Sequence, residues 1–177
     1  NFLVNYSHYC FNVLKRPMIA LKLANSADSK ITFSNGSSKW ITSKLSRKHV
    51  HQIRSQFDAI LIGSKTFLKD NPSLTVRIDG YKKPISRVIL DANLLIDDKS
   101  KLINTVKNNP LIIFTNKNLD NKKARFLISK GIKIFHTKKL ADGYLCILSI
   151  IKKLYELNFQ KVLVEGGAKT ASSFLNK

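Results

Sequence analysis

Short apolar runs alternate with amphipathic stretches along most of this chain. The clearest run is 59–62, Ala-Ile-Leu-Ile, and comparable runs occupy 86–90, 111–115, 132–135 and 162–164. Runs of this length, rich in β-branched residues, predict strands buried on both faces of a sheet. Stretches with apolar residues on one helical face, at 43–57, 64–70, 121–129 and 143–157, predict the intervening helices. The alternation therefore predicts an α/β sheet with helices on both faces.

Each predicted helix has start and stop signals and a core-facing side. Thr42 or Ser43 is the expected N-cap of the first helix and Ser64 that of the second, which Asn71-Pro72 ends. The residues expected to face the core are Leu45, Val50, Ile53 and Phe57 in the first helix, Phe67 and Leu68 in the second, and Leu145, Leu148, Ile151, Leu154 and Tyr155 in the last.

The beginning of the chain is less regular. Residues 1–16 mix aromatic and polar side chains without clean periodicity and run into Pro17, which indicates a connector. Residues 18–24 predict the first strand, with Lys22 set among apolar neighbours. A lysine in such a run most often extends to a sheet edge and less often faces a ligand cleft, so both interpretations stay open.

Two strand ends run into glycine and then into a helix start. Gly63 follows the run at 59–62, and Gly166-Gly167 follow the run at 162–164. Free backbone N–H groups at a helix start bind anions, and paired glycines let a phosphate approach the backbone. If both turns lie at the carboxyl ends of sheet strands, they line one cleft. An ordinary strand-turn-helix without a ligand remains the alternative.

Three further residues are open to a functional and a structural interpretation. Trp40, the only tryptophan, follows a glycine-containing loop at 34–38 and is either core filler or a platform for a ring. Arg77 ends an extended segment, 73–77, that carries its guanidinium toward the Gly63 turn, or it is a surface arginine. Arg54 lies near the end of its helix, where it compensates the helix dipole or binds a ligand.

The net charge of +20 raises the question of a nucleic-acid partner. However, 25 lysines outnumber 6 arginines and are scattered among 15 asparagines. Readers of nucleic acid usually concentrate arginine and aromatic side chains on one element. A general bias toward Lys, Asn and Ile explains the charge more simply, so we expect no nucleic-acid partner, and a phosphorylated small molecule stays compatible.

Length and cysteine content favour a single soluble domain. The 177 residues suit one domain with a substantial core. Cys10 and Cys146 lie far apart without a C-x-x-C pair, which predicts neither a metal site nor a disulfide framework. No apolar run reaches the length of a membrane span. We therefore expect a cytoplasmic protein without a membrane partner.

Four motifs occur together in the order and spacing of one known family. They are Pro-Met-Ile-Ala-Leu-Lys-Leu-Ala-Asn-Ser-Ala-Asp at 17–28, Gly-Ser-Ser-Lys-Trp-Ile-Thr at 36–42, Asp-Asn-Pro-Ser-Leu-Thr-Val-Arg at 70–77 and Val-Glu-Gly-Gly at 164–167. From about Arg16 onward the chain resembles the reductase domain of the bacterial riboflavin-biosynthesis deaminase-reductase.

The resemblance implies a dihydrofolate-reductase-like fold with a mixed sheet and an oxidoreductase activity. In that reaction NADPH reduces C1′ of the ribosyl group of 5-amino-6-(5-phosphoribosylamino)uracil to the ribityl product. The residues that would contact NADPH are Ala24, Trp40, Thr66, Asp70, Ala92, Gly167, Ala168, Lys169, Thr170, Ala171, Ser172 and Ser173. Those that would hold the phosphorylated substrate are Ser38, Arg54, Leu74, Arg77 and Glu165. Lys22 is our catalytic candidate, for electrostatic help beside Ala24.

The chain departs from the family pattern in several places. Ser29 replaces the usual glycine after the first motif, and Ser37 replaces an acidic residue that is often found in the Gly-x-Ser-x-Trp loop. The family's domain continues with antiparallel strands beyond the Gly-Gly helix, and its deaminase carries an H-x-E and a P-C-x-x-C motif that this chain lacks. We therefore expect 1–16 to connect to an upstream deaminase domain, 17–177 to be a reductase domain without its C-terminal strands, and the full-length protein to form homo-oligomers.

Two other functions stay open. A dihydrofolate or pterin reductase of the same fold needs a buried carboxylate against the pterin, whereas this chain offers Arg54 and Arg77 to a phosphate. A truncated, non-catalytic remnant is the second alternative. We expect the 177 residues alone to fold poorly or to associate, because missing strands would leave a central strand without a neighbour.

Overall fold

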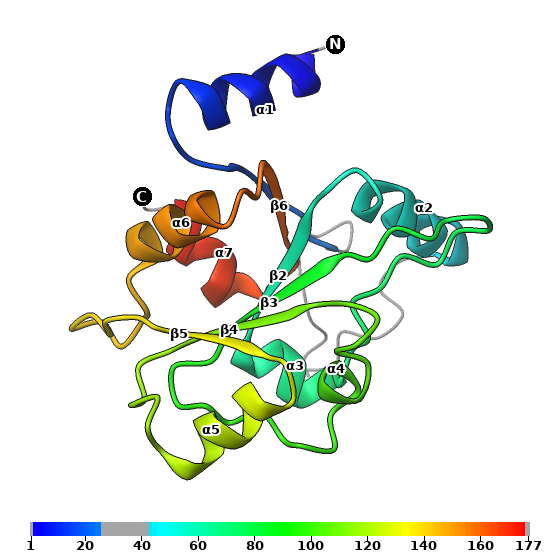
Figure 1. Ribbon diagram of the computed structural model, residues 1–177. Helices are drawn as coiled ribbons and strands as arrows, with labels where there is room; N and C mark the ends of the chain where they lie inside the picture. The colour runs from blue at the N-terminus through cyan, green and yellow to red at the C-terminus, as the bar shows by residue number, and fades with distance from the viewer. Residues whose placement is uncertain (1, 26–42, 176–177) are drawn as a thin grey trace.

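Parallel strands form the centre of the structure, a computed structural model that describes residues 2–25 and 43–175 (Figure 1). The sheet has the order β1-β6-β2-β3-β4-β5. Its strands are β1 (Met18–Leu21), β2 (Ala59–Gly63), β3 (Ser86–Leu90), β4 (Leu111–Thr115), β5 (Lys133–His136) and β6 (Lys161–Val164). All pairings between these strands are parallel, so within the described residues no antiparallel strand makes the sheet mixed.

The central strands are buried because helices cover both faces of the sheet. Every residue of β2 and β4 is buried, as their unbroken apolar runs predict. Leu61 of β2 aligns with Val88 of β3 on one side and with Val164 of β6 on the other. β6, the strand before the last helix, pairs with β1 on one side and with β2 on the other. Among the described strands no central strand lacks a neighbour, contrary to the expectation from the sequence.

Helices cover both faces of the sheet, and the amino-terminal helix lies apart at its end (Figure 1). They are α1 (Phe2–Asn12), α2 (Lys44–Arg54), α3 (Ser64–Asp70), α4 (Lys101–Asn104), α5 (Lys122–Ser129), α6 (Ile147–Glu156) and α7 (Ala168–Leu175). Side chains of α3, α4 and α5, such as Phe67 and Leu127, pack into one core cluster. Side chains of α6 and α7, such as Leu154 and Phe174, pack into another. Within the described residues no helix is both long and apolar enough to cross a membrane.

The predicted helix boundaries are largely confirmed. Ser43 caps α2 by accepting from the Ser46 N–H at 3.1 Å. Asn71 ends α3 in the left-handed conformation, with φ of 38°. The N-cap of α3 is Gly63 without a side-chain hydrogen bond, so the prediction of Ser64 as the cap was wrong by one residue.

Three expected core residues point outward instead. Leu45, Leu68 and Leu148 are 78%, 51% and 59% exposed. In α6 the buried residues are Ile147, Ile150 and Leu154. The first two precede the expected residues Leu148 and Ile151 by one position, and Leu154 is as expected. α3 and α6 each have adjacent apolar residues, Phe67-Leu68 and Ile147-Leu148, and packing against the sheet buries only the first of each pair.

The amino-terminal segment is helical where aperiodic sequence indicated a connector. Residues 2–12 form α1, and its Cys10 is fully buried. Cys10 packs with Met18 of β1, Phe57 and Leu163 of β6. The helix is held by this small cluster beside the start of β1.

A buried arginine fixes the short helix α4 against the sheet. Arg87 of β3 is fully buried and donates from Nη1 to Thr105 Oγ1 at 2.7 Å and from Nη2 to the Leu102 carbonyl at 3.0 Å. Nη2 also donates to the Asn109 carbonyl. Burial lowers the pKa of Arg87 to about 10, so the guanidinium stays charged at neutral pH. It connects three acceptors of the segment that follows Ser100.

Candidate functional site

The two predicted glycine turns lie side by side at the carboxyl end of the sheet. β2 and β6 are parallel neighbours, so their carboxyl ends meet, and the Glu165 N–H donates to the Leu61 carbonyl at 2.9 Å. After β2 the chain enters α3 on one face, and after β6 it enters α7 on the other face. Adjacent strands whose helices leave to opposite faces create a crevice at their carboxyl ends, where α/β proteins bind ligands.

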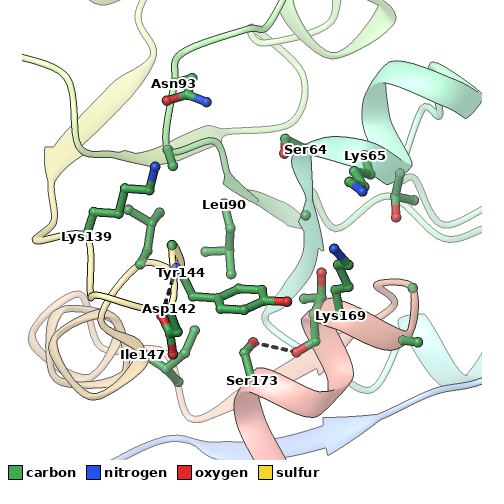
Figure 2. Close-up of a pocket in the computed structure, with 18 residues that line it drawn as sticks. Ser64, Lys65, Leu90, Asn93, Lys139, Asp142, Tyr144, Ile147, Lys169 and Ser173 are labelled. Carbon is green, nitrogen blue, oxygen red and sulfur yellow. Dashed lines mark hydrogen bonds between the residues drawn. The ribbon is translucent and has the colours of Figure 1, made fainter.

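A cavity of about 550 Å³ occupies this crevice (Figure 2). Its walls come from the start of α3, the end of β3, the start of α7 and the segment between β5 and α6. The lining residues are Gly63, Ser64, Lys65, Thr66, Leu90, Ala92, Asn93, Lys139, Asp142, Gly143, Tyr144, Leu145, Ile147, Gly167, Ala168, Lys169, Thr170 and Ser173. A cavity of this size suits a ligand with at least one ring system.

Glycines let α7 pack closely against the sheet edge. A Cβ added at Gly63 or Gly166 would overlap the Thr170 side chain, so larger residues at either position would force α7 away. Gly167 differs, because a Cβ there would meet nothing within 4 Å. Gly63 and Gly166 therefore serve packing, whereas Gly167 leaves free space in front of the α7 N-terminus.

A small hairpin between β5 and α6 forms the opposite wall. Lys139 and Leu145 form an antiparallel bridge, and the Leu140 N–H donates to the Tyr144 carbonyl at 2.7 Å. Gly143 makes the tight turn with φ of 83°. Figure 2 shows the Tyr144 ring extending from this hairpin toward α7, where Lys169 lies. The hairpin thus offers the aromatic face of Tyr144 and the cation of Lys139, and Lys169 adds a cation on the α7 side of the cavity.

A second group of polar residues is centred on Glu165, two residues before Gly167. Arg54 of α2 donates from Nε to Glu165 Oε1 at 2.7 Å and from Nη2 to Oε2 at 2.8 Å. Its Nη1 donates to the Thr75 carbonyl at 3.0 Å. The Arg54 side chain is 14% exposed and that of Glu165 is 8% exposed. This bidentate pair ties α2 to the end of β6 and to the segment at 73–77.

His51 joins this pair to Arg77. Its Nε2 lies 3.2 Å from Nε and 3.1 Å from Nη2 of Arg77, and its Nδ1 lies 3.2 Å from the Thr75 carbonyl. Burial lowers the pKa of His51, and the positive charges of Arg54 and Arg77 lower it further, against a smaller opposing effect of Glu165. His51 is therefore neutral at pH 7. The exposed Arg77 guanidinium is left as the cation of this group that reaches solvent.

Leu74 lies between these groups but faces the core. Its side chain is 4% exposed and belongs to the cluster of β2, β3 and β4, and its φ is +50°. The expected substrate contact at this position is therefore limited to its backbone. The buried side chain anchors the segment that carries Thr75 and Arg77.

Lys22 and Ala24 line a different cavity from the α7 turn. The Lys22 N–H donates to the Val164 carbonyl at 2.9 Å, which places the end of β1 beside Glu165. Both residues line a cavity of about 670 Å³ against α2. Lys22 and Ala24 thus line the same cavity, whereas the residues of the Gly167 turn line the other one. Lys22 lies at the carboxyl end of the sheet, on the side where Glu165 is.

The other residues expected at the cofactor, and Ser38 of the expected substrate site, divide into three groups. Those that line the 550 Å³ cavity are Thr66, Ala92, Gly167, Ala168, Lys169, Thr170 and Ser173. Ala171 is buried behind the turn, and Asp70 and Ser172 are exposed outside the lining. Ser38 and Trp40 lie outside the described residues.

Sequence reasoning missed His51 and the hairpin residues Lys139 and Tyr144. A signal for His51 existed, because His51 and Arg54 are three residues apart and share one face of a helix. No sequence signal indicated the hairpin. The stretch 143–157 was interpreted as one helix, whereas α6 begins only at Ile147.

The chain matches known proteins along most of its length. It is 39% identical over 98% of its length to the riboflavin biosynthesis protein RibD of Aquifex aeolicus, and 38% identical over 90% to that of Bacillus amyloliquefaciens. These matches cover 47% and 42% of the two relatives, so the chain spans about half the length of the curated relatives it matches.

Solved structures show the same fold. The chain matches 45% of a diaminohydroxyphosphoribosylaminopyrimidine deaminase/5-amino-6-(5-phosphoribosylamino)uracil reductase from Thermotoga maritima, with 97% of the chain covered, 36% identity and a TM-score of 0.77. RibD of Acinetobacter baumannii has a TM-score of 0.80 at 23% identity, over 99% of this chain and 47% of that one. The expected α/β, dihydrofolate-reductase-like fold is confirmed. A family model described as "RibD C-terminal domain" matches residues 17–177, and the chain belongs to this family.

Proposed function

We propose that the chain is the reductase part of a riboflavin-biosynthesis enzyme, which reduces 5-amino-6-(5-phosphoribosylamino)uracil with NADPH. The ribosyl group becomes a ribityl group when the bond between C1′ and the ring oxygen breaks, C1′ gains a hydride and the ring oxygen gains a proton. NADPH, when bound, supplies the hydride. The residues of the chain align the two molecules, neutralise the phosphates and exclude water.

The crevice between β2 and β6 is the observation that carries this proposal. Two glycine turns meet there around a cavity of about 550 Å³, and Gly167 leaves open space before the α7 N-terminus. This arrangement fits a dinucleotide, whose pyrophosphate binds to backbone N–H groups at a helix start. Tyr144 offers a flat surface for a ring, and Lys169 and Ser173 are within the lining to neutralise or bind a phosphate.

The Glu165 group supports the substrate side. Arg77 reaches solvent with its guanidinium braced by His51, and a guanidinium suits the geometry of a phosphate. Arg54 supports this site indirectly, since three of its N–H groups already bind Glu165 and the Thr75 carbonyl. Lys22 lies on the same side, and its ammonium would stabilise negative charge that develops near C1′.

The pterin-reductase alternative fits this geometry less well. Such an enzyme uses a buried carboxylate to bind the pterin, and Glu165 is a buried carboxylate of this candidate site. Both of its oxygens accept from Arg54, at 2.7 and 2.8 Å. A pterin would have to break this charged pair, whereas a phosphorylated substrate leaves it intact.

The experiment combines cofactor binding with turnover. Trp40 is the only tryptophan, so we expect NADPH to quench the tryptophan fluorescence and NADH to do so at higher concentration only. We expect NADPH oxidation to require the phosphoribosylaminouracil and to yield the ribityl product, with no turnover of dihydrofolate. Absence of quenching and of oxidation at saturating substrate would overturn the assignment.

A further inference from the structure

His51 occupies a position that no ligand-binding motif predicted. It lies on α2, is 9% exposed, and forms polar contacts with Thr75 and Arg77. The charged groups that face it are Arg54 of its own helix, Arg77 of the segment after α3, and Glu165 after β6. The position of a buried, titratable side chain at the centre of a candidate phosphate site indicates a role in that site.

The partners of the ring fix its tautomer. A guanidinium only donates hydrogen bonds, so Nε2, which faces Nε and Nη2 of Arg77, must present its lone pair. The Thr75 carbonyl only accepts, so Nδ1 carries the proton and donates to it across 3.2 Å. The Arg77 backbone N–H also lies 3.2 Å from Nδ1, a contact that the other tautomer would favour, but that tautomer would set Nε2–H against two donors.

We propose that His51 is a positioning residue, which in its neutral Nδ1–H form holds the Arg77 guanidinium toward the substrate phosphate and releases it when the ring is protonated. The proposal rests on the proposed role of Arg77 in binding that phosphate. His51 occupies Nε and one N–H of Nη2, and the remaining N–H groups of the guanidinium stay available to a phosphate. Without this support an exposed arginine samples many rotamers.

Protonation of His51 turns the attractive contact between its Nε2 and the Arg77 guanidinium into a repulsive one. The ring then points an N–H at the donors of Arg77 and adds a positive charge beside Arg54 and Arg77, and among the described residues Glu165 is the carboxylate that opposes this charge. Burial and the two arginines lower the pKa of His51, so this occurs below its ordinary value of 6.5. Phosphate affinity that depends on Arg77 is therefore lost as the pH falls through that lowered pKa.

Two substitutions at His51 separate the acceptor from the titration. His51→Gln keeps a side-chain oxygen near the position of Nε2 and cannot be protonated, whereas His51→Leu removes the acceptor. His136→Gln is the matched control, since His136 is exposed at the end of β5, on the far edge of the sheet. The measurements are the dissociation constant of ribose 5-phosphate, the KM of the phosphoribosylaminouracil, kcat, and NADPH binding, from about pH 5 to pH 8.

We expect His51→Leu to weaken ribose 5-phosphate binding and to raise the substrate KM about tenfold at pH 7, with kcat and NADPH affinity little changed. We expect His51→Gln to retain most of the wild-type affinity. A phosphate monoester itself titrates near pH 6, so the comparison with His51→Gln at each pH isolates the histidine. Wild type should lose affinity relative to His51→Gln at acid pH, and the His136→Gln variant should follow wild type.

Spectroscopy tests the tautomer without any turnover. Long-range ¹⁵N correlation spectra of the histidine rings should show His51 as the Nδ1–H form at pH 7, and its Nε2 resonance should shift in Arg77→Ala. An Nε2–H tautomer, or a wild-type affinity that rises relative to His51→Gln at acid pH, would overturn the proposal. If the tautomer and ribose 5-phosphate results hold but no NADPH is oxidised, the proposed reaction is wrong and the role of His51 stands.

Discussion

Arg54 and Arg77 contribute to one polar network but have different partners. Arg54 is mostly buried and binds both oxygens of Glu165. Arg77 is exposed and is braced by the ring of His51. The sequence indicated that both would hold a phosphate jointly, and the geometry supports direct contact by Arg77 and an indirect role of Arg54.

Substitution of each arginine by alanine should separate these roles. We expect Arg77→Ala to weaken substrate binding by about 1.5–3 kcal/mol, the range for a hydrogen bond to a charged group, with NADPH binding and stability little changed. Arg54→Ala leaves the carboxylate of Glu165 buried and unpaired, so we expect it to reduce stability by about 3 kcal/mol as well as substrate binding. Urea unfolding and binding titrations measure both. Equal loss of both ligand affinities in Arg77→Ala would mean that Arg77 is structural.

The glycines of the two turns also have distinct roles, which alanine substitutions should show. A Cβ at Gly63 would overlap Thr170, so we expect Gly63→Ala to destabilise the fold by about 1–3 kcal/mol through overpacking. A Cβ at Gly167 meets nothing within 4 Å, so Gly167→Ala should keep the stability and weaken NADPH binding. Tryptophan quenching and urea unfolding report the two effects. Unchanged NADPH affinity in Gly167→Ala would show that the cofactor does not approach this turn.

At the scale of whole elements, the strands were predictable and the phase of the helices was not. A strand buried on both faces, such as β2 or β4, is defined by its apolar run alone. In α6, Ile147 and Leu148 are both apolar, and only packing against β4 and β6 decides that Ile147 is buried. α1 lacked any periodic pattern, and it packs through Cys10 in a cluster of distant residues and through Phe11 against Tyr155 of α6.

The candidate site shows the same division. The glycine turns were recognisable because each follows a strand directly, and a parallel sheet places their carboxyl ends together. The contact of His51 with Arg77 joins residues 26 positions apart, through a segment whose path depends on the left-handed Leu74. The wall formed by Tyr144 depends on a hairpin of seven residues, 139–145, that the apolar pattern had assigned partly to a helix.

The turn after β3 provides a pH-dependent prediction. Asp91 is fully buried and accepts from the Ile96 N–H at 2.9 Å, and burial raises its pKa above 3.8 despite that hydrogen bond. Its contribution to stability is thus largest below the unfolded pKa and is lost as the pH rises through the folded pKa. We expect wild type to gain stability relative to Asp91→Asn between pH 7 and about pH 4.

Asp97→Asn is the control for this prediction, with the opposite sign. Asp97 is exposed, and the Lys99 N–H that donates to it is the main cause of its lowered pKa. Wild type should therefore lose stability relative to Asp97→Asn as the pH falls. Urea unfolding over this pH range measures both differences. If wild type instead lost stability relative to Asp91→Asn at acid pH, the fold would favour the charged form of the buried Asp91 carboxyl.

At the scale of the whole molecule, the two sheet edges differ in how well they are protected. β5 exposes Lys133, and a charged edge residue opposes pairing with other chains. β1 has no such protection among the described residues. Met18 and Lys22 donate their N–H groups toward β6, so by the two-residue period of a strand the N–H groups of Ile19 and Leu21 point to the outer edge. No described strand pairs with that edge.

This edge predicts how the chain associates. We expect the 177-residue chain to self-associate through β1, because N–H groups of an edge strand that pair with no described strand recruit a strand of another copy. Ile19→Pro removes one outward N–H without removing a hydrogen bond to β6, and it should shift the chain toward monomer in sedimentation experiments. Ile19→Ala is the matched control, since it removes the same side chain but keeps the N–H, and it should associate as wild type does. If Ile19→Ala and Ile19→Pro behave alike, the association depends on the side chain or on another surface, and β1 is not the contact.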